Sequence, residues 1–367
     1  MPDKDTHFLN IALDLGRRML GQTAPNPAVG CVIVKDGVIV GQGVTQKGGR
    51  PHAETEALKE AGDKAKGATV YVSIEPCAHK GRTGSCASAL IKAGVARVVA
   101  PLEDPDPRVS GKGFHMLHEA GIEVLTGLCE EEAERVNEGF LKRMRYGRPM
   151  FTLKLATSLD GRIATAKGES RWISGEESRA YAHRLRATHD GIMVGIGTVR
   201  ADNPLLSCRL PGLEEFSPIR IVVDRKLRLP FDSQLVRTAR QYPLWIITSD
   251  RHEADHVALY EQEGAKIVSV PVNEEGYADP LIAARKLGEL GLTRVLIEGG
   301  AHLAAAFLRE DLVDRLEWVT APLLLGSDAL PAMEVLGREL LADHPRFKST
   351  GMRLLGQDRL ESFVRAG

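Results

Sequence analysis

The chain has 367 residues, more than one compact domain usually contains, so two domains of comparable size are expected. Lys and Arg number 48 and Asp and Glu 49, for a formal net charge of −1, which excludes a strong overall attraction to nucleic acid or to an anionic membrane. The N-terminus lacks the features of a signal peptide, and no later stretch approaches the ~20 apolar residues of a membrane span. These properties predict a cytoplasmic protein that acts on a small, locally charged molecule.

The first part of the chain alternates helix and strand patterns, which is typical of an α/β layer fold. Two apolar runs joined at Asp36-Gly37 predict a β-hairpin. A charged helix ends at Gly147 and Pro149 follows it, so we place a domain boundary near Arg148. The other predicted helices span about residues 6–20, 85–93 and 113–120, with one beginning near His52, and the predicted strands are "AVGCVIVKDGVIVGQG" (the hairpin), "ATVYVSI", "ARVVA" and "IEVLTG".

The second part of the chain alternates in the same way and predicts a second α/β domain with its own core. One helix opens with "SGEE", in which Ser174 and Glu177 are expected to form a capping box. Another begins at Ala301. The predicted strands are "FTLKLA", "GIMVG", "IRIVVD", "LWIITS", "RVLIEGG" and "RLEWVTAPLLLG". The two predicted domains are residues 1–147 and 148–367.

The five cysteines are too few and too scattered for a disulfide scaffold, and their number is odd. Cys31, Cys129 and Cys208 are interpreted as packing residues. Cys77 and Cys86 differ, because they flank the loop "EPCAHKGRTGSC". A disulfide between them is less expected for the reasons above, and a metal site and plain loop packing are the other two interpretations.

His52 and Glu54 lie upstream at the start of a predicted helix, in "PHAETEAL". One imidazole and two thiolates, from His52, Cys77 and Cys86, suit Zn²⁺ and leave its fourth position for water, which a catalytic site requires. Glu54 is placed to move protons rather than to bind the metal. A purely structural zinc site is the alternative, and it would need a fourth ligand, for which His79 is the nearest candidate.

The His-x-Glu and Pro-Cys pattern matches the signature of zinc-dependent nucleobase deaminases, except that eight residues rather than two separate the cysteines. The insert "AHKGRTGS", together with "PNPAVGCVIVKDG" and "DPDPRVSGKG", resembles the bifunctional riboflavin-biosynthesis deaminase-reductase family. The resemblance implies an N-terminal cytidine-deaminase-like three-layer domain that acts on a phosphoribosylated diaminopyrimidinone. It further implies a C-terminal dihydrofolate-reductase-like domain that uses NADPH.

Two further groups are candidates for substrate binding in the first domain. The Asn26 amide, in "PNP", suits a pyrimidine edge, although Asn is as often a turn former in such a sequence. Lys80 and Arg82 in the loop between the cysteines suit the ribose phosphate through charge-assisted bonds. The alternative for Lys80 and Arg82 is a solvated loop.

In the second domain, "IEGG" followed by a helix predicts a strand, a glycine turn and a helix N-terminus, which suits a phosphate or is an ordinary connection. It lacks the full dinucleotide fingerprint. Three blocks, "LKLATSLDGRIATAKGESRWIS", "LRATHDGIMVGIGTVRADNPLLSCR" and "IEGGAHLAAAFL", resemble the family's reductase. This resemblance implies NADPH contacts at Ala156, Trp172, Thr198, Asp202, Gly299, Gly300 and Ala301, and substrate contacts at Lys154, Ser170, Arg186, Leu206, Arg209 and Glu298.

Arginine chemistry adds two expectations. Arg186 and Arg209 are suited to grip a phosphate bidentately, although each could be an ordinary surface residue. Arg225 follows the strand "IVVD", where an Arg could meet a 2′-phosphate, and its role is left open.

Two other functions fit the same sequence. One is a nucleoside or RNA-base deaminase with an accessory domain, and the other is a zinc-stabilised nucleotide-binding module. The near-zero net charge and the lack of aromatic-rich basic patches argue against RNA. We expect a homo-oligomer that binds a small molecule, without nucleic acid or a membrane as partner.

Overall fold

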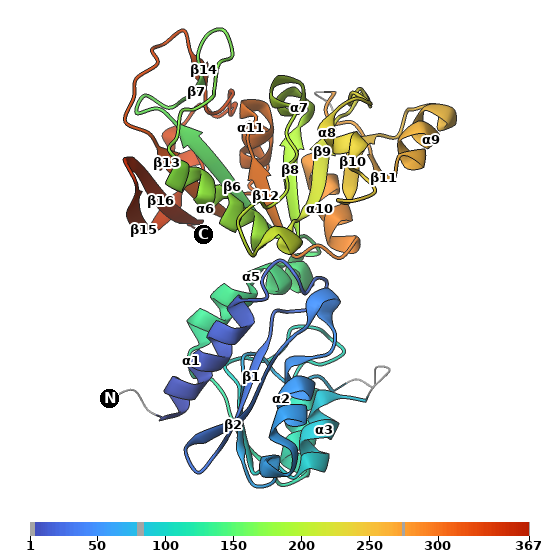
Figure 1. Cartoon of the computed structure of the whole chain (residues 1–367), viewed down its shortest axis with the longest axis vertical. Helices are drawn as coiled ribbons and strands as arrows, with labels where there is room; N and C mark the ends of the chain where they lie inside the picture. Colours follow the sequence, from blue (N-terminus) through green and yellow to red (C-terminus); the bar gives the residue numbers. More distant parts are fainter. Residues whose placement is uncertain (1–3, 79–83, 274–275, 367) are drawn as a thin grey trace. The chain divides into compact units, whose positions relative to one another are not determined.

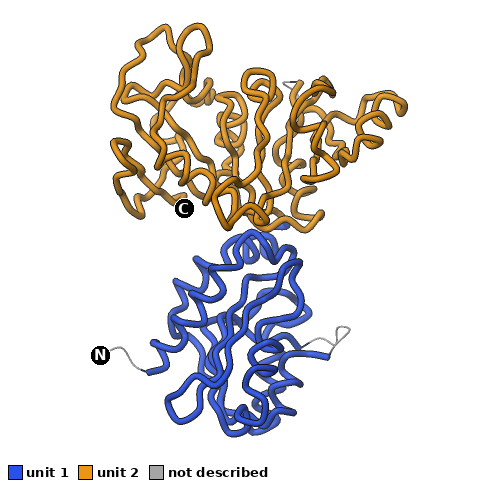
Figure 2. The backbone as a smooth tube through the Cα atoms, in the orientation of Figure 1, with its two compact units in different colours: residues 1–147 blue, residues 148–367 orange. Residues whose placement is uncertain are grey.

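The computed structural model describes residues 4–78, 84–273 and 276–366. The chain divides into two compact units, Met1–Gly147 and Arg148–Gly367 (Figure 2). Within the described ranges, no helix is long and apolar enough to cross a membrane. Each unit contains its own main sheet and its own buried apolar core.

The sheet of the first unit has the strand order β2-β1-β3-β4-β5 over the described residues. The predicted hairpin is confirmed: β1 and β2 are antiparallel, and Asp36 and Gly37 between them have φ of 53° and 78°, as a tight hairpin turn requires. The remaining strands run parallel to one another. The strands are β1 Gly30–Lys35, β2 Val38–Val44, β3 Thr69–Val72, β4 Arg97–Val99 and β5 Glu123–Leu125.

Helices cover both faces of this sheet, which makes three layers. Figure 1 shows α1 (Lys4–Arg17) and α5 (Glu130–Tyr146) on one side and α2 (Ala53–Ala61) and α3 (Cys86–Ala93) on the other. The remaining α-helix described in this unit, α4 (Lys112–Glu119), contacts α3. The helices α3 and α5 follow the predicted segments closely, because amphipathic spacing and terminal glycines mark their ends.

Glycines let two helices lie directly on the sheet backbone. A Cβ on Gly30 of β1 would be 1.9 Å from the Ala12 carbonyl of α1. A Cβ on Gly43 of β2 would be 2.2 Å from the Ala53 carbonyl of α2. Residue 43 therefore has to be glycine for the start of α2 to take its place.

The second unit is built on a larger sheet, with the order β11-β10-β9-β8-β12-β6-β13-β16-β15 among described residues. The strands from β11 to β13 run parallel, and β16 and β15 add antiparallel strands at one edge. A separate pair joins β7 and β14. The strands are β6 Met150–Thr157, β7 Arg162–Ala164, β8 Gly191–Gly195, β9 Ile219–Val223, β10 Leu244–Ser249, β11 Ala265–Val270, β12 Arg294–Glu298, β13 Arg315–Thr320, β14 Leu330–Pro331, β15 Phe347–Leu355 and β16 Asp358–Arg365.

Two apolar clusters lie on opposite faces of this sheet. Phe151, Ile297 and Phe307 belong to one, and Leu185 and Leu296 to the other. Because strand residues alternate between faces, the polar side chains of β6 and β12 described below share the α6 face with Leu185. The helices are α6 Glu176–Ala187, α7 Ile196–Asp202, α8 Gln234–Arg237, α9 Ala254–Gln262, α10 Pro280–Glu289 and α11 Ala301–Arg309.

The predicted capping box at the start of α6 is wrong. The N-cap is Gly175, and neither Ser174 nor Glu177 caps the helix. Asp358 of β16 takes that role, because its Oδ2 accepts hydrogen bonds from Gly175 N at 2.7 Å and from Ser178 Oγ at 2.6 Å. A buried carboxylate at a helix N-terminus is a stronger acceptor than a serine hydroxyl.

Candidate functional site

Three metal-ligating side chains meet in the first unit. The ligand atoms of His52, Cys77 and Cys86 all lie within 4.8 Å of one another. His52 Nδ1 is 3.6 Å from Cys77 Sγ and 3.4 Å from Cys86 Sγ. Zinc ligands at about 2.1 and 2.3 Å stand about 3.6 Å apart at a tetrahedral angle. The three side chains therefore fit a Zn²⁺ ion, and no fourth ligand among described residues belongs to the group; His79 lies outside those residues.

Two helix N-termini position these ligands. His52 is the N-cap of α2, and Cys86 is the first residue of α3, whose N-cap Ser85 accepts a hydrogen bond from Ser88 N. Cys77 lies between the helices, and its Sγ accepts from Cys86 N at 3.3 Å. The positive ends of the two helices favour thiolates at this point.

The electrostatics of the cluster match this placement. Hydrogen bonds from Cys86 and from His52 lower the pKa of Cys77 to about 4, against the effect of burial. Glu54, in the first turn of α2, is 4% exposed, and burial raises its pKa, with Cys77 adding to the effect. The Cys86 side chain also interacts with the Glu54 carboxyl. Glu54 therefore lies beside the three ligands as a carboxyl group that retains a proton more readily than an exposed one.

Glu75, to which the sequence interpretation gave no role, holds the ligand loop. Its buried carboxylate accepts main-chain hydrogen bonds from Asp104 and Gly111 at Oε2 and from Gly113 and Phe114 at Oε1, at 2.8 to 3.3 Å. Glu75 thereby joins the Cys77 loop to the loop before α4. The sequence signal for this role is the position of Glu75, directly before Pro76 and the candidate ligand Cys77.

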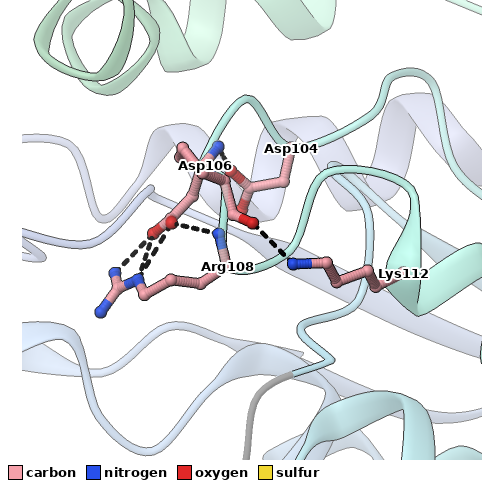
Figure 3. A network of polar contacts seen from close by, with 5 residues as sticks. Asp104, Asp106, Arg108 and Lys112 are labelled. Carbon is pink, nitrogen blue, oxygen red and sulfur yellow. Dashed lines mark hydrogen bonds and ion pairs between the residues drawn. The ribbon is translucent and has the colours of Figure 1, made fainter.

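Asp104 is a second residue that the interpretation missed, although it lies in the quoted motif "DPDPRVSGKG". Burial raises its pKa to about 7. The hydrogen bond from Asp106 N opposes this shift, and the charges of Asp106, Glu75 and Cys77 add to it. Its Oδ1 accepts from Asp106 N at 2.9 Å, and Asp106 pairs in turn with Arg108 (Figure 3). Lys112 closes the same loop by donating to the Pro107 carbonyl. A titratable carboxyl thus lies within electrostatic reach of the candidate metal centre.

Of the candidate substrate contacts in the first unit, the structure describes only Asn26. Asn26 Nδ2 donates to the Gly49 carbonyl at 2.8 Å, in the segment that leads to His52. The amide therefore supports the loop before the cluster. Lys80, like Arg82, lies outside the described residues.

In the second unit, Lys154, Glu298 and Arg186 come together. Lys154 of β6 and Glu298 of β12 are in register on neighbouring strands. Arg186 of α6 binds both oxygens of Glu298, at 2.8 Å from Nε and 2.6 Å from Nη2, and donates from Nη1 to the Ser207 carbonyl. The expectation that Arg186 grips a phosphate bidentately does not match this arrangement, because its fork already holds Glu298. Arg209, unlike Lys154 and Arg186, is an exposed residue.

The predicted cofactor contacts lie at the carboxyl ends of the parallel strands. The turn after β12 is confirmed: Gly299 and Gly300 have φ of 87° and 88°, and α11 begins at Ala301. A Cβ on Gly300 would be 3.3 Å from Thr198 Oγ1 of α7. The carboxyl ends of the strands are where ligands bind in open α/β sheets.

The other predicted contacts lie on several segments of the second unit. Trp172 is 69% exposed, with the guanidinium groups of Arg171 and Arg179 over its ring. Arg171 also donates to the Asp202 carbonyl at 2.7 Å, which ties the Trp172 segment to the end of α7. Three predicted contacts remain. Ala156 lies on β6, two residues after Lys154, and Leu206 is buried. The carbonyl of Ser170 accepts a hydrogen bond from Ile173 N.

Comparison with known proteins matches both units. Residues 2–101 match the cytidine and deoxycytidylate deaminase zinc-binding region, and residues 149–360 match the RibD C-terminal domain. The riboflavin biosynthesis protein RibD of Escherichia coli K12 is 43% identical over 366 residues, covering 97% of this chain and 98% of that protein. RibD of Bacillus amyloliquefaciens is 41% identical, covering 96% and 94%.

Two solved structures agree with this result. Acinetobacter baumannii RibD, form 1, has a TM-score of 0.89 and 39% identity, covering 99% of both chains. A diaminohydroxyphosphoribosylaminopyrimidine deaminase/5-amino-6-(5-phosphoribosylamino)uracil reductase of Thermotoga maritima has a TM-score of 0.85 and 30% identity over the same shares.

The fold and the matched regions define a two-domain α/β protein with a deaminase-type zinc-binding region followed by a reductase domain. The chain belongs to the RibD family of riboflavin biosynthesis proteins. The predicted family and fold class, a cytidine-deaminase-like domain followed by a dihydrofolate-reductase-like domain, are confirmed.

Proposed function

We propose that this chain catalyses two reactions of riboflavin biosynthesis, one in each unit. The first is hydrolytic deamination of 2,5-diamino-6-ribosylamino-4(3H)-pyrimidinone 5′-phosphate. The second is NADPH-dependent reduction of the ribosyl side chain to ribityl. The convergence of His52, Cys77 and Cys86 beside the buried Glu54 carries the proposal.

In the deamination, water adds to the ring carbon that bears the amino group, ammonia leaves, and a carbonyl remains. His52, Cys77 and Cys86 would hold a zinc ion, which would supply a water with a pKa lowered toward ~7. The Glu54 carboxylate accepts one proton of the attacking water and delivers it to the ring nitrogen. It then takes the proton of the new C–OH group and delivers it to the amine, so that ammonia departs and a carbonyl forms. The raised pKa of Glu54 suits a group that must carry this proton. Asn26 and Lys80 are assigned to the substrate's pyrimidine and phosphate.

In the reduction, NADPH supplies the hydride that reaches C1′ of the opened sugar, so the chain's task is to bind and orient. The cofactor contacts proposed are Ala156, Trp172, Thr198, Asp202, Gly299, Gly300 and Ala301. Substrate is assigned to Lys154, Ser170, Leu206, Arg209 and Glu298, with Arg186 holding the Glu298 carboxylate. The basic groups Lys154, Arg186 and Arg209 outnumber the carboxylates of Glu298 and Asp358 that act on Lys154, which favours an anionic substrate.

We infer that the protein works in the cytoplasm as a homo-oligomer, and that its partner is the phosphorylated pyrimidine rather than nucleic acid. The sequence offers no basic, aromatic-rich surface for RNA. A nucleoside or RNA-base deaminase would release ammonia from cytidine or RNA, and a binding module would release none. These outcomes separate the three functions.

The test is ammonia release from the diaminopyrimidinone substrate, coupled to NADPH oxidation, with zinc content measured on the same protein. We expect about one zinc per chain and both activities. Cys86→Ser should abolish bound zinc and ammonia release together, because Ser is a far poorer ligand than a thiolate. NADPH oxidation with pre-deaminated substrate should persist in that variant. Full zinc occupancy in Cys86→Ser would refute the ligand assignment.

A further inference from the structure

The segment that carries Leu206 and Arg209 has an unusual backbone. Leu206 is 3% exposed and has φ of +59°. A bulky side chain at positive φ costs free energy, and such a conformation persists only where surrounding contacts hold it. The contacts that hold this segment therefore also decide where the Arg209 guanidinium lies.

Helix α6 provides these contacts to three successive residues. Arg186 Nη1 donates to the Ser207 carbonyl at 3.0 Å. The Cys208 thiol donates to the His183 carbonyl at 3.4 Å. The Arg209 main-chain N–H donates to His183 Nδ1 at 3.2 Å. His183 thus contacts the segment twice, one turn of helix before Arg186.

The bond to Arg209 requires a neutral imidazole with its proton on Nε2, because Nδ1 has to accept. The charged groups facing the ring are Arg186 on α6, Arg209 on the segment and Glu298 on β12. Burial, then Arg186 and Arg209, lower the pKa of His183 to about 4, while Glu298 and the Ser207 carbonyl oppose the shift. The acceptor at Nδ1 is therefore present at neutral pH.

We propose that His183 is a positioning residue of the reductase unit, whose Nδ1 fixes the Arg209 main chain so that the guanidinium meets the anionic group of the substrate. The inference rests on the proposed function, because it assumes that Arg209 binds the substrate phosphate. Neither zinc nor the first unit takes part in it.

Two substitutions separate this role from packing. His183→Asn places an amide oxygen near the position of Nδ1 and keeps an acceptor for Arg209 N–H. His183→Leu fills similar space without an acceptor. Leu is the better helix former of the two, so an effect on helix stability alone would favour His183→Leu and act against the prediction.

The experiment uses the full chain and follows NADPH oxidation with the pre-deaminated phosphorylated substrate. His183→Leu should raise KM about five- to ten-fold with kcat within about two-fold, as expected when one hydrogen bond that supports uniform binding is lost. His183→Asn should return KM to within about two-fold of the unsubstituted protein. Arg209→Ala should raise KM further, and adding His183→Leu to it should change nothing more, because both changes remove the same contact.

Several outcomes overturn the proposal: an unchanged KM in His183→Leu, a loss in His183→Asn equal to that in His183→Leu, or additive effects in the double variant. NADPH binding by each variant shows that the second unit is folded. If His183→Leu fails this check, His183→Gln, which moves the acceptor by one bond, takes its place with the same expected rise in KM. Absence of NADPH oxidation in the unsubstituted protein would instead refute the proposed function.

Discussion

Glu54 combines two properties that a proton carrier requires. It is nearly inaccessible to solvent, and it lies beside the three candidate metal ligands without being one of them. Desolvation disfavours its charged form, so the carboxyl can receive a proton in one step and give it up in the next. The same carboxyl would be a poor proton carrier if it were exposed, because it would then stay ionised at neutral pH.

Glu54→Gln should therefore leave zinc bound and reduce deamination by about 10²- to 10⁴-fold, since Gln keeps the size and loses the proton transfer. Zinc content and ammonia release measured on one preparation test this. Glu56→Gln, in the same turn of α2, is the matched control and should deaminate normally. Near-normal turnover of Glu54→Gln would show that Glu54 is structural.

His183 links pH to the stability of the second unit. Its pKa is about 4 in the folded protein and near 6.5 ordinarily, so between these values the unfolded chain binds a proton that the folded chain does not. The free energy of unfolding should fall as pH decreases from about 6.5 toward 4. His183→Asn removes this titration, so its stability should decline less steeply over the same range. Urea unfolding of the full chain at pH 7 and pH 4.5 measures the change in the free energy of unfolding between the two pH values. An equal change in the unsubstituted protein and in His183→Asn would contradict the prediction.

The hairpin β1-β2 positions the start of α2, because the helix backbone rests on the glycines of β2. In Gly43→Ala the new Cβ would overlap the Ala53 carbonyl, and the N-terminal turn that carries His52 and Glu54 has to shift. We expect weaker zinc retention and at least ten-fold slower deamination, because small misplacements of catalytic groups are costly. Reduction should be unchanged.

Gly37→Asn is the control in the same hairpin. Position 37 has positive φ and open space around it, and Asn tolerates that backbone. If both variants lost zinc to the same extent, hairpin stability rather than the seating of α2 would explain the loss.

Local patterns predicted most of these elements, and they failed where a distant group decided the outcome. The hairpin at Asp36-Gly37 and the turn at Gly299-Gly300 depend on neighbouring residues and were predictable. The cap of α6 comes from Asp358, 183 residues after Gly175, so "SGEE" could not show it. Turn chemistry is local, whereas the choice among competing acceptors is tertiary.

The candidate site divides in the same way. The spacing of His52, Glu54, Cys77 and Cys86 indicated the cluster because each residue carries a distinctive ligand or proton-transfer chemistry. The pairing of Arg186 with Glu298 was not predictable, since it joins α6 to β12 across 112 residues. A sequence pattern identifies which functional groups are present. It does not show whether the Arg186 guanidinium pairs with a substrate phosphate or with Glu298.

Each unit has its own core, so the second should fold alone. Its first residue matters, because Arg148 binds both oxygens of buried Asp314, at 2.7 and 2.9 Å. We expect the fragment Arg148–Gly367 to bind NADPH and to reduce pre-deaminated substrate without zinc.

A fragment that starts at Met150 lacks Arg148. Loss of one member of such an ion pair costs about 3 kcal/mol, so its melting temperature should be roughly 6–12 °C lower. Thermal unfolding of both fragments tests this. A folded fragment without NADPH binding would refute the reductase assignment, and two unfolded fragments would mean that the units do not fold independently.

The capping of α6 by Asp358 has a consequence for synthesis of the chain. Ribosomes add about 5–20 residues per second, and domains fold in order from the N-terminus. The first unit ends at Gly147, so it can fold and acquire its metal while the rest is still being made. Until Asp358 emerges, roughly 10 to 40 s later, α6 lacks its cap and β13 its antiparallel partner. Nascent chains on a polysome should therefore deaminate before any of them can reduce.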